Sequence, residues 1–270
     1  MMTITRGKAA SLVLGLIILA SLAAPLLTPY DPDEINLDSL KSSPSHTHPL
    51  GTDQKGRDVL ARVLHGGRIS VGVAITAAVL SMSIGLLVGL VSGYFGGRLD
   101  TALMALVDLV LSFPSLLLAI GISMILPQGI YTVMIAIAAV GWAAFARLIR
   151  GHVLALREEP YVEAAKALGC GPGRIIFVHL LPQCVPLSLV MTGLKIGGFI
   201  ITEASLSFLG LGAQPPTASW GSMISAGRSY IVAAPWMVLF PGLAIAVTAL
   251  SFNILGDALQ ERFGLKKIKA

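Results

Sequence analysis

The sequence predicts an all-α membrane protein with six membrane-spanning helices. Of its 270 residues, 55% are hydrophobic and only 12% are charged, and the mean hydropathy is +0.82. A soluble domain carries about 25% charged residues because its surface must be solvated, so half that fraction indicates lipid as the solvent. The apolar residues also gather into runs of about 18 or more, the length that a helix needs to cross roughly 30 Å of hydrocarbon. These runs lack the alternation of barrel strands, and we therefore predict helices.

Six apolar runs define the predicted spans. They are residues 9–27, 69–94, 101–126, 130–147, 184–204 and 236–255. The first run is longer than the apolar core of a secretory signal and further spans follow it, so we interpret it as a retained anchor. This divides the chain into an anchor with an extracytoplasmic loop (residues 1–68), a transmembrane domain (69–262) and a cytoplasmic tail (263–270).

Basic residues predict the topology, because Lys and Arg concentrate in cytoplasmic loops. Twelve of the 19 lie on the side of both termini, six lie on the other side, and Lys195 lies inside a span. We therefore expect a multi-pass protein of the cytoplasmic (inner) membrane with both termini in the cytoplasm. The net charge of +5 has the same origin, so nucleic-acid binding is not predicted. Cys170 and Cys184 form no CxxC pattern, which argues against a disulfide framework and a thiolate metal site.

The outer loop between the first two spans contains a predicted surface helix. Residues 51–53 offer an N-cap, and an apolar face would follow it. The residues of that face are Val59, Leu60, Val63 and Leu64. We expect this helix to lie flat on the outer membrane surface. His46 and His48 lie earlier in the loop, where histidines at this spacing are usually solvated, so we predict no metal site.

The loop of residues 148–182 is the most informative connection. Pro160 suits the first turn of a helix, residues 161–168 are good helix formers, and Gly169 ends the helix. A second short helical piece is predicted over residues 174–181. Small or charged groups that another protein could contact are Glu163, Ala164, Ala165, Lys166, Gly169 and Arg174. From the residues alone, an ordinary amphipathic connector accounts for the same pattern.

The spacing E-A-A-x-x-x-G followed by L-P resembles the EAA loop of the permease subunits of bacterial binding-protein-dependent ABC importers. The matching residues are Glu163, Ala164, Ala165, Gly169, Leu181 and Pro182. His179 stands where that family usually has Ile, which is similar to its dipeptide and oligopeptide branch. The resemblance implies that this loop, including Tyr161, Lys166 and Arg174, is a coupling helix that docks on the ATPase subunit.

Four further stretches resemble the C-type permease subunit of the dipeptide, oligopeptide and nickel branch. They are L-G-T-D-Q-K-G-R-D-V-L-A-R (50–62), G-Y-F-G-G-R-L-D (93–100), S-F-L-G-L-G-A-Q-P-P-T-A-S-W-G (207–221) and F-N-I-L-G-D-A-L (252–259). The C-terminus departs from the family, because no Asp-Pro follows residue 260. The resemblance implies a type I transmembrane domain that works with a second permease subunit, two ATP-binding subunits and an extracytoplasmic substrate-binding protein. Peptides are the expected cargo, with nickel or a metal chelate as the alternative.

Motifs that the chain lacks bear on its chemistry. No G-x-x-x-x-G-K-[ST] occurs, so we expect ATP to be bound and hydrolysed by separate chains, and this chain to be no enzyme and to need no cofactor. Neither G-x-S-G nor H-E-x-x-H is present, which argues against an intramembrane peptidase. A self-contained secondary transporter is the alternative from another class, although its expected internal repeat is not found.

Two ionisable residues inside the predicted spans are candidates for function, since charges in lipid are costly. Lys195 lies roughly 16 Å from the inner end of its span and Asp108 roughly 10 Å from the inner end of its own. Two interpretations stay open: Lys195 pairs with Asp108, or Lys195 faces the pathway and attracts an anionic group such as a peptide carboxylate.

Polar residues near the outer end of the fifth span form a third candidate. Glu203, with Ser205 and Ser207, would belong to an outer gate that contacts the binding protein, or to an interfacial turn. For Trp220 and Trp236 we predict anchoring at the membrane interface.

Overall fold

The structure is a computed structural model that describes the backbone of residues 2–263 and the side chains of residues 7–263. Within this range it is helical and contains no strand. The α-helices are α1 (Met2–Leu22), α2 (Ala24–Leu27), α3 (Val59–Phe95), α4 (Gly97–Ser112), α5 (Ser115–Ile125), α6 (Ile130–Leu156), α7 (Pro160–Ala167), α8 (Pro172–Arg174), α9 (Leu181–Phe208), α10 (Trp220–Gly227) and α11 (Trp236–Arg262). The predicted tail lies outside the described residues except for Phe263, as do Lys266, Lys267 and Lys269 and the side chain of Arg6.

Four helices in the described part are long and apolar enough to cross a membrane. They are α3, α6, the continuous helix Pro172–Phe208 and α11. The bent pair α4 and α5 passes the same test together, while the apolar part of α1, Gly7–Leu22, is shorter. The all-α membrane fold is confirmed, and the six predicted runs correspond to four or five spans with α1 beside them.

The third predicted span is broken, so the expectation of one helix over residues 101–126 is wrong. α4 and α5 are bent by 94° at a break between Ser112 and Ser115. Phe113 has φ −91° and ψ 143°, the extended conformation that a following proline favours. Pro114 also lacks the N–H that would continue the helix.

The predicted surface helix is wrong as well, because its residues form the first turns of α3. The N-cap is Asp58 rather than Asp53, since the Asp58 carboxylate accepts a hydrogen bond of 2.7 Å from the Ala61 N–H. Val59 is buried and packs in one cluster with Ala218 and Met223. This apolar face therefore contacts protein from α10 and its approach instead of the membrane surface.

A stripe of glycines joins α3 to α6. The glycines lie four residues apart on one face of α3 and are Gly85, Gly89 and Gly93. A Cβ at Gly89 would lie 2.7 Å from the Ile149 Cβ, closer than side chains approach each other. Small residues at this spacing let helix backbones pack closely in a membrane, where lipid leaves little hydrophobic drive for association.

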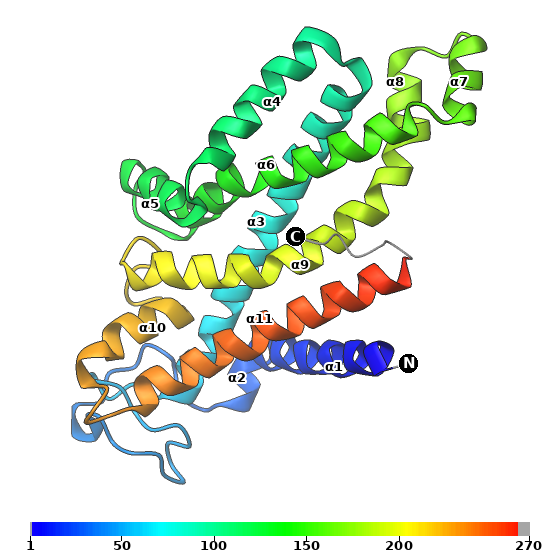
Figure 1. Cartoon of the computed structure of the whole chain (residues 1–270). Coiled ribbons are helices and arrows are strands. Elements are labelled where there is room, and N and C mark those ends of the chain that lie inside the picture. The colour runs from blue at the N-terminus through cyan, green and yellow to red at the C-terminus, as the bar shows by residue number, and fades with distance from the viewer. Residues whose placement is uncertain (1, 264–270) are drawn as a thin grey trace.

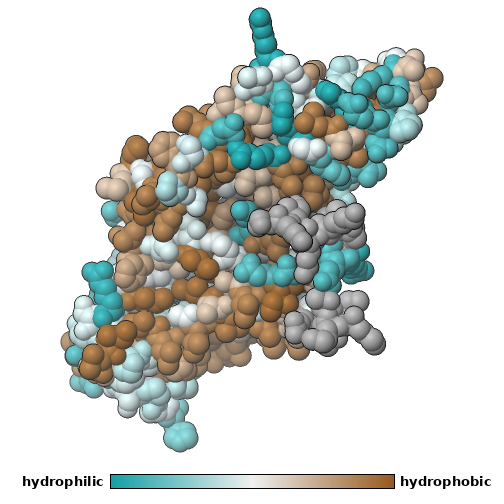
Figure 2. All heavy atoms as spheres, in the orientation of Figure 1, coloured by the Kyte–Doolittle hydropathy of each residue, from teal (hydrophilic) through white to brown (hydrophobic). Residues whose placement is uncertain are grey.

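The polar segments lie at two opposite ends of the molecule. Figure 1 shows α7 and α8 at one end, and α10 with the loop of residues 28–58 at the other. Figure 2 shows hydrophilic atoms at these two ends and beside the grey atoms on the right, with mostly hydrophobic atoms over the surface between the ends. An apolar middle between polar ends is the arrangement that a membrane-spanning protein requires.

Candidate functional site: the loop between α6 and α9

α7 forms as the sequence predicts. Pro160 stands in its first turn, and the helix ends in a Schellman motif. In that motif the Cys170 N–H donates to the Ala165 carbonyl at 3.0 Å and the Gly169 N–H donates to the Lys166 carbonyl at 2.9 Å. Gly169 has φ +79°, a left-handed conformation that favours glycine. The glycine therefore sets the direction in which the chain leaves α7.

The inner face of α7 is packed into the protein. Val162 and Ala165 are buried in a hydrophobic cluster that draws on α3, α6 and the Pro172–Phe208 helix. Among the partners are Leu90, Ile149 and Cys184. Ala165 is only 6% exposed, so its small side chain serves this packing and offers no outer surface, in contrast to the expectation for it.

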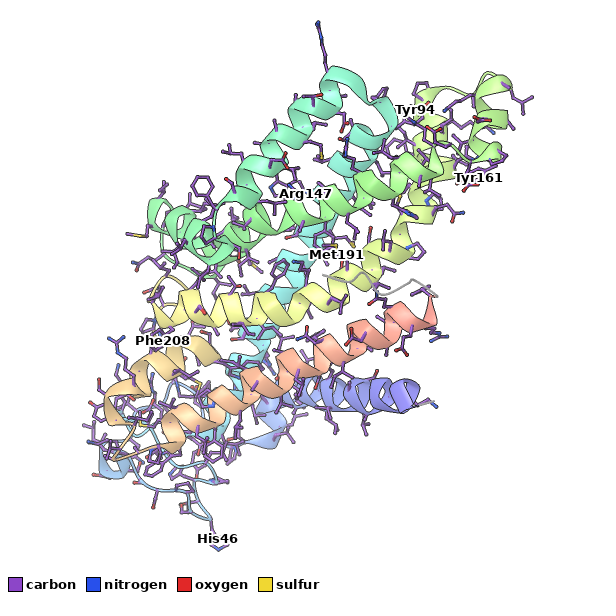
Figure 3. The ribbon with its side chains drawn as sticks, in the orientation of Figure 1. His46, Tyr94, Arg147, Tyr161, Met191 and Phe208 are labelled. Atoms are coloured by element: carbon purple, nitrogen blue, oxygen red, sulfur yellow. The ribbon has the colours of Figure 1, made fainter. Side chains whose placement is uncertain are left out.

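The outer face of α7 and the following turn are exposed. The exposed residues include Tyr161, Glu163, Ala164, Lys166, Gly169 and Arg174. Tyr161 lies at the far polar end of the molecule (Figure 3). Partial burial, with a smaller contribution from Glu159, raises the pKa of the Tyr161 phenol, so it stays a neutral hydrogen-bond donor.

Two exposed apolar residues of this end escaped sequence reasoning. Leu168 is 85% exposed and Phe177 is 57% exposed. Large apolar side chains on an otherwise polar end are typical of protein contact surfaces. Their signal in the sequence was an apolar residue directly before the capping glycine and another three residues after Arg174.

The predicted short helix over residues 174–181 is instead the start of a longer one, so the expected separate piece is wrong. A π-helical turn, Ile175–Leu180, connects α8 to α9, and the Leu181 N–H donates to the Ile176 carbonyl. Pro182 is the second residue of α9 and directly follows this π-helical turn. Leu181 and Pro182 thus belong to the base of a span and not to the exposed helix.

Residues 93–100 (G-Y-F-G-G-R-L-D) contain the turn from α3 into α4 and an aspartate that binds α4 to α6. Gly96 and Gly97 have positive φ angles of 65° and 58° and turn the chain from α3 into α4. Asp100 then forms a bidentate ion pair with Arg150 of α6, with both N–O distances 2.6 Å. Such paired, charge-assisted bonds also define the relative orientation of the helices.

The intramembrane pair predicted between Lys195 and Asp108 is wrong. Asp108 pairs with Arg147 of α6, because α4 packs directly on α6. Their side chains are 65% and 54% exposed respectively. Lys195 instead lines a cavity of about 580 Å³ together with Arg147 and Met191.

Glu203 and Trp220 are enclosed by the protein. Glu203 is 1% exposed and accepts a hydrogen bond of 2.7 Å from the Ser207 hydroxyl. Trp220 is also 1% exposed, and its indole N–H donates to the Val63 carbonyl at 2.9 Å. The anchoring predicted for Trp220 is therefore wrong, because α10 turns this ring into the core against α3. Trp236 is partly buried and donates to the Thr52 carbonyl at 3.0 Å.

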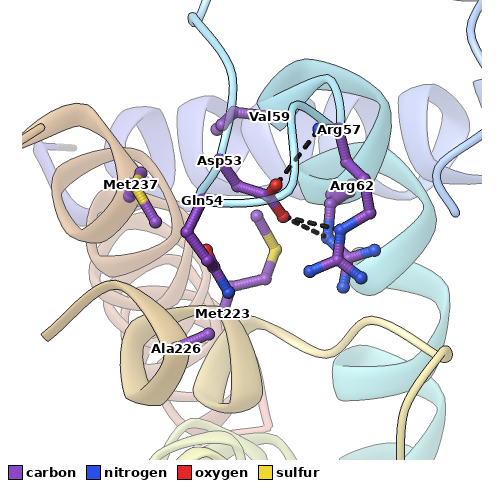
Figure 4. Close-up of a pocket in the computed structure, with 8 residues that line it drawn as sticks. All are labelled: Asp53, Gln54, Arg57, Val59, Arg62, Met223, Ala226 and Met237. Atoms are coloured by element: carbon purple, nitrogen blue, oxygen red, sulfur yellow. Dashed lines mark hydrogen bonds and ion pairs between the residues drawn. The ribbon is translucent and has the colours of Figure 1, made fainter. Parts of the chain in front are cut away.

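At the other end of the molecule, residues 50–62 (L-G-T-D-Q-K-G-R-D-V-L-A-R) contain a cluster of buried charged side chains. The Asp53 carboxylate accepts from the Arg57 side chain at 2.7 Å, and the Arg62 Nε lies 3.8 Å away (Figure 4). Arg62 also donates to the Pro32 carbonyl at 2.7 Å, which fastens the outer loop to α3. His48 contacts Asp58 at 2.9 Å, so it is a partner of the α3 cap and not a solvated residue.

These features define a class of protein. Long apolar helices, polar ends and an exposed helix whose back is packed against the spans are typical of the membrane-embedded subunit of a transporter. The chain belongs to the family of binding-protein-dependent transport system inner membrane components, whose profile matches residues 85–267. It is therefore a permease subunit of an ABC importer and not an enzyme, and this membership decides against the self-contained secondary transporter.

Three similar proteins match most of the chain. The glutathione transport system permease protein GsiD of Pectobacterium atrosepticum is 43% identical over 94% of this chain and 84% of its own length. The oligopeptide transport system permease protein OppC of Bacillus subtilis is 40% identical over 93% and 82%. The dipeptide transport system permease protein DppC of Alkalihalophilus pseudofirmus is 42% identical over 92% and 84%.

A solved structure shares the fold. A chain of the MetNI methionine ABC transporter, determined in inward-facing conformations, matches with a TM-score of 0.58 and 18% identity. The match covers 74% of this chain and 95% of that one. At this identity the likeness supports the type I transmembrane architecture alone.

Proposed function

We propose that this chain forms half of a translocation pathway for di- or oligopeptides and is driven through α7 by ATP-binding subunits. The observation that carries the proposal is the two-sided packing of α7. Its inner face is buried against three spans, while its outer face presents small and charged groups to a partner. A partner that pushes on this face would move the spans. The peptide cargo is supported by the relatives, which are named for glutathione, oligopeptide and dipeptide transport.

The proposed placement in the inner membrane puts α7 and both termini in the cytoplasm. The loop of residues 28–58 and α10 then lie outside, where they face the substrate-binding protein, and a second permease subunit completes the pathway. The excess of Lys and Arg on the side of α7 supports this orientation. In this arrangement residues 1–68 contain the N-terminal anchor and the outer loop, residues 69–262 form the transmembrane domain with the pathway, and residues 263–270 are a cytoplasmic tail.

The coupling role can be tested in the assembled transporter in proteoliposomes. Ala164→Glu and Gly169→Asp place bulk and unpaired charge on the exposed face, and we expect both to abolish peptide uptake while the chain still inserts. Arg98→Glu changes the charge of an exposed residue at the start of α4, outside α7, and is the control, for which uptake persists. Normal uptake with either loop variant would refute the role of this face.

Nickel or a metal chelate is the alternative cargo. The measurement that decides is which compound the cognate binding protein retains and the assembled transporter accumulates. Uptake of nickel without uptake of any dipeptide would replace the peptide assignment and leave the permease assignment intact.

A further inference from the structure

We infer that the cavity between α6 and α9 binds a carboxylate group of the cargo, with Lys195 as the cation that recognises it. The inference rests on the proposed function, because it assumes that this face of the chain lines the pathway. Beyond the proposed function, it names the carboxylate as the chemical group that the pathway recognises and Lys195 as the side chain that recognises it.

The cavity has the size and character of a small-molecule site. Its volume is about 580 Å³, within the range of roughly 300–1,000 Å³ typical of ligand pockets. Most of its walls are apolar, including Leu111, Leu187 and Leu194. Figure 3 shows its two sides, with Arg147 on α6 and Met191 on α9.

The charge balance of the cavity favours an anion. Arg147 already holds Asp108, so that pair contributes little net charge. Within the described residues, no carboxylate lies within ion-pair distance of Lys195, which lines the cavity at intermediate exposure. An ammonium without a counterion in an apolar wall attracts a carboxylate far more strongly than it would in water.

The exposure of the ion pair indicates that this face does not contact lipid. Asp108 and Arg147 are 65% and 54% exposed, on helices of the apolar middle of the molecule. Charges that faced lipid at this depth would cost several kcal/mol, so the surface requires water or protein in front of it. A large cavity at the same place favours the water-filled pathway over a packed subunit contact.

The test uses thiol chemistry at the cavity in the assembled transporter in nanodiscs. Met191→Cys places a thiol in the wall, in a background in which the other cysteines, Cys170 and Cys184 among them, are replaced. Two methanethiosulfonate reagents of similar size, one sulfonate and one trimethylammonium, react with it, and their rates are normalised to free cysteine. Leu12→Cys, on an exposed apolar position of α1, is the lipid-facing control.

We expect the sulfonate reagent to react at least about fivefold faster than the ammonium reagent, because one charge about 8 Å away shifts the energies of the two reagents by about 0.5 kcal/mol in opposite directions even at the dielectric of water. Lys195→Met should abolish the preference and Lys195→Arg should retain it. Millimolar glycylglycine should slow the reaction, whereas glycylglycinamide, which lacks the carboxylate, should not. The Leu12→Cys thiol should stay unreactive.

Three results would overturn the inference. Lack of reaction with both reagents would mean that the partner subunit or lipid covers the cavity. A preference that persists in Lys195→Met, or equal protection by both dipeptides, would mean that Lys195 recognises no carboxylate. If Ala164→Glu still abolishes uptake in any of these cases, only the carboxylate site is rejected and the proposed function stands.

Discussion

The close contact between α3 and α6 makes Gly89→Ala a sharp test of the packing. The added Cβ would lie 2.7 Å from the Ile149 Cβ and 2.8 Å from the Ala146 carbonyl oxygen. Ordinary contacts begin at 3.4 Å, so the helices must separate by about 0.7 Å at this point. Neither opposing atom can rotate away, because one belongs to the backbone and the other is attached to it.

The expected cost is that of overpacking a closely packed interface, about 1–3 kcal/mol. For a domain of this size each kcal/mol lowers the Tm by about 2–4 °C, so we expect a decrease of about 2–12 °C. The assay heats the detergent-solubilised transporter and measures the monodisperse fraction by fluorescence-detected size-exclusion chromatography.

The same helix offers a matched control. A Cβ at Gly72 meets nothing within 4 Å, so Gly72→Ala introduces the same methyl group into α3 without a clash. We expect it to be neutral or slightly stabilising, because alanine favours the helix by about 1 kcal/mol over glycine. Equal Tm values for the Gly89→Ala and Gly72→Ala variants would refute the close packing of α3 on α6.

Two further changes test the cap of α3 and the turn after α7. Asp58→Ala removes the hydrogen bond to the Ala61 N–H and should destabilise the chain by about 1–2 kcal/mol, while Asp58→Asn should preserve most of the cap; equal Tm losses would contradict the capping role. Gly169→Ala forces a side chain into φ +79° at a cost of about 1–2 kcal/mol and should reduce uptake, whereas Gly171→Ala, at φ −65°, should not; the measurement is peptide uptake, and equal rates would contradict the requirement for glycine.

The fold class and α7 could be predicted because both depend on local information. A helix surrounded by lipid needs apolar side chains along its length, so each span is visible as an apolar run in the sequence. The ends of α7 are marked by the backbone preferences of Pro160 and Gly169 alone. The family resemblance implies which subunit contacts the loop, but it does not predict which face of α7 is buried and which is exposed. Ala165 is buried because α3 and α6 lie against its side of α7. The positions of these distant helices cannot be predicted from the local sequence.

The errors arise where a side chain meets a distant helix. Tryptophan is frequent at membrane interfaces, and this frequency predicts that Trp220 is an anchor. Its indole N–H instead donates a hydrogen bond to the carbonyl of Val63, 157 positions earlier in the chain. Depth in the membrane predicts that Asp108 pairs with Lys195, but depth does not define how α4 is rotated about its axis. That rotation places Asp108 beside Arg147. The bend at Pro114 has a local signal, since a proline in an apolar run indicates a break.

Residues of α6 that pack over the glycine stripe also belong to the cluster that buries the inner face of α7, and this leads to a prediction about coupling. Ile149 packs over Gly89 and also belongs to the cluster that buries Val162. A displacement of α7 is therefore passed to α3 and α6 together, as long as their contact stays close. If Gly89→Ala separates the helices, part of that displacement is lost, and we expect fewer peptides transported per ATP hydrolysed at a temperature where the variant is still folded. An unchanged ratio in a variant with a lowered Tm would show that α7 acts on the spans by another route, through the base of α9.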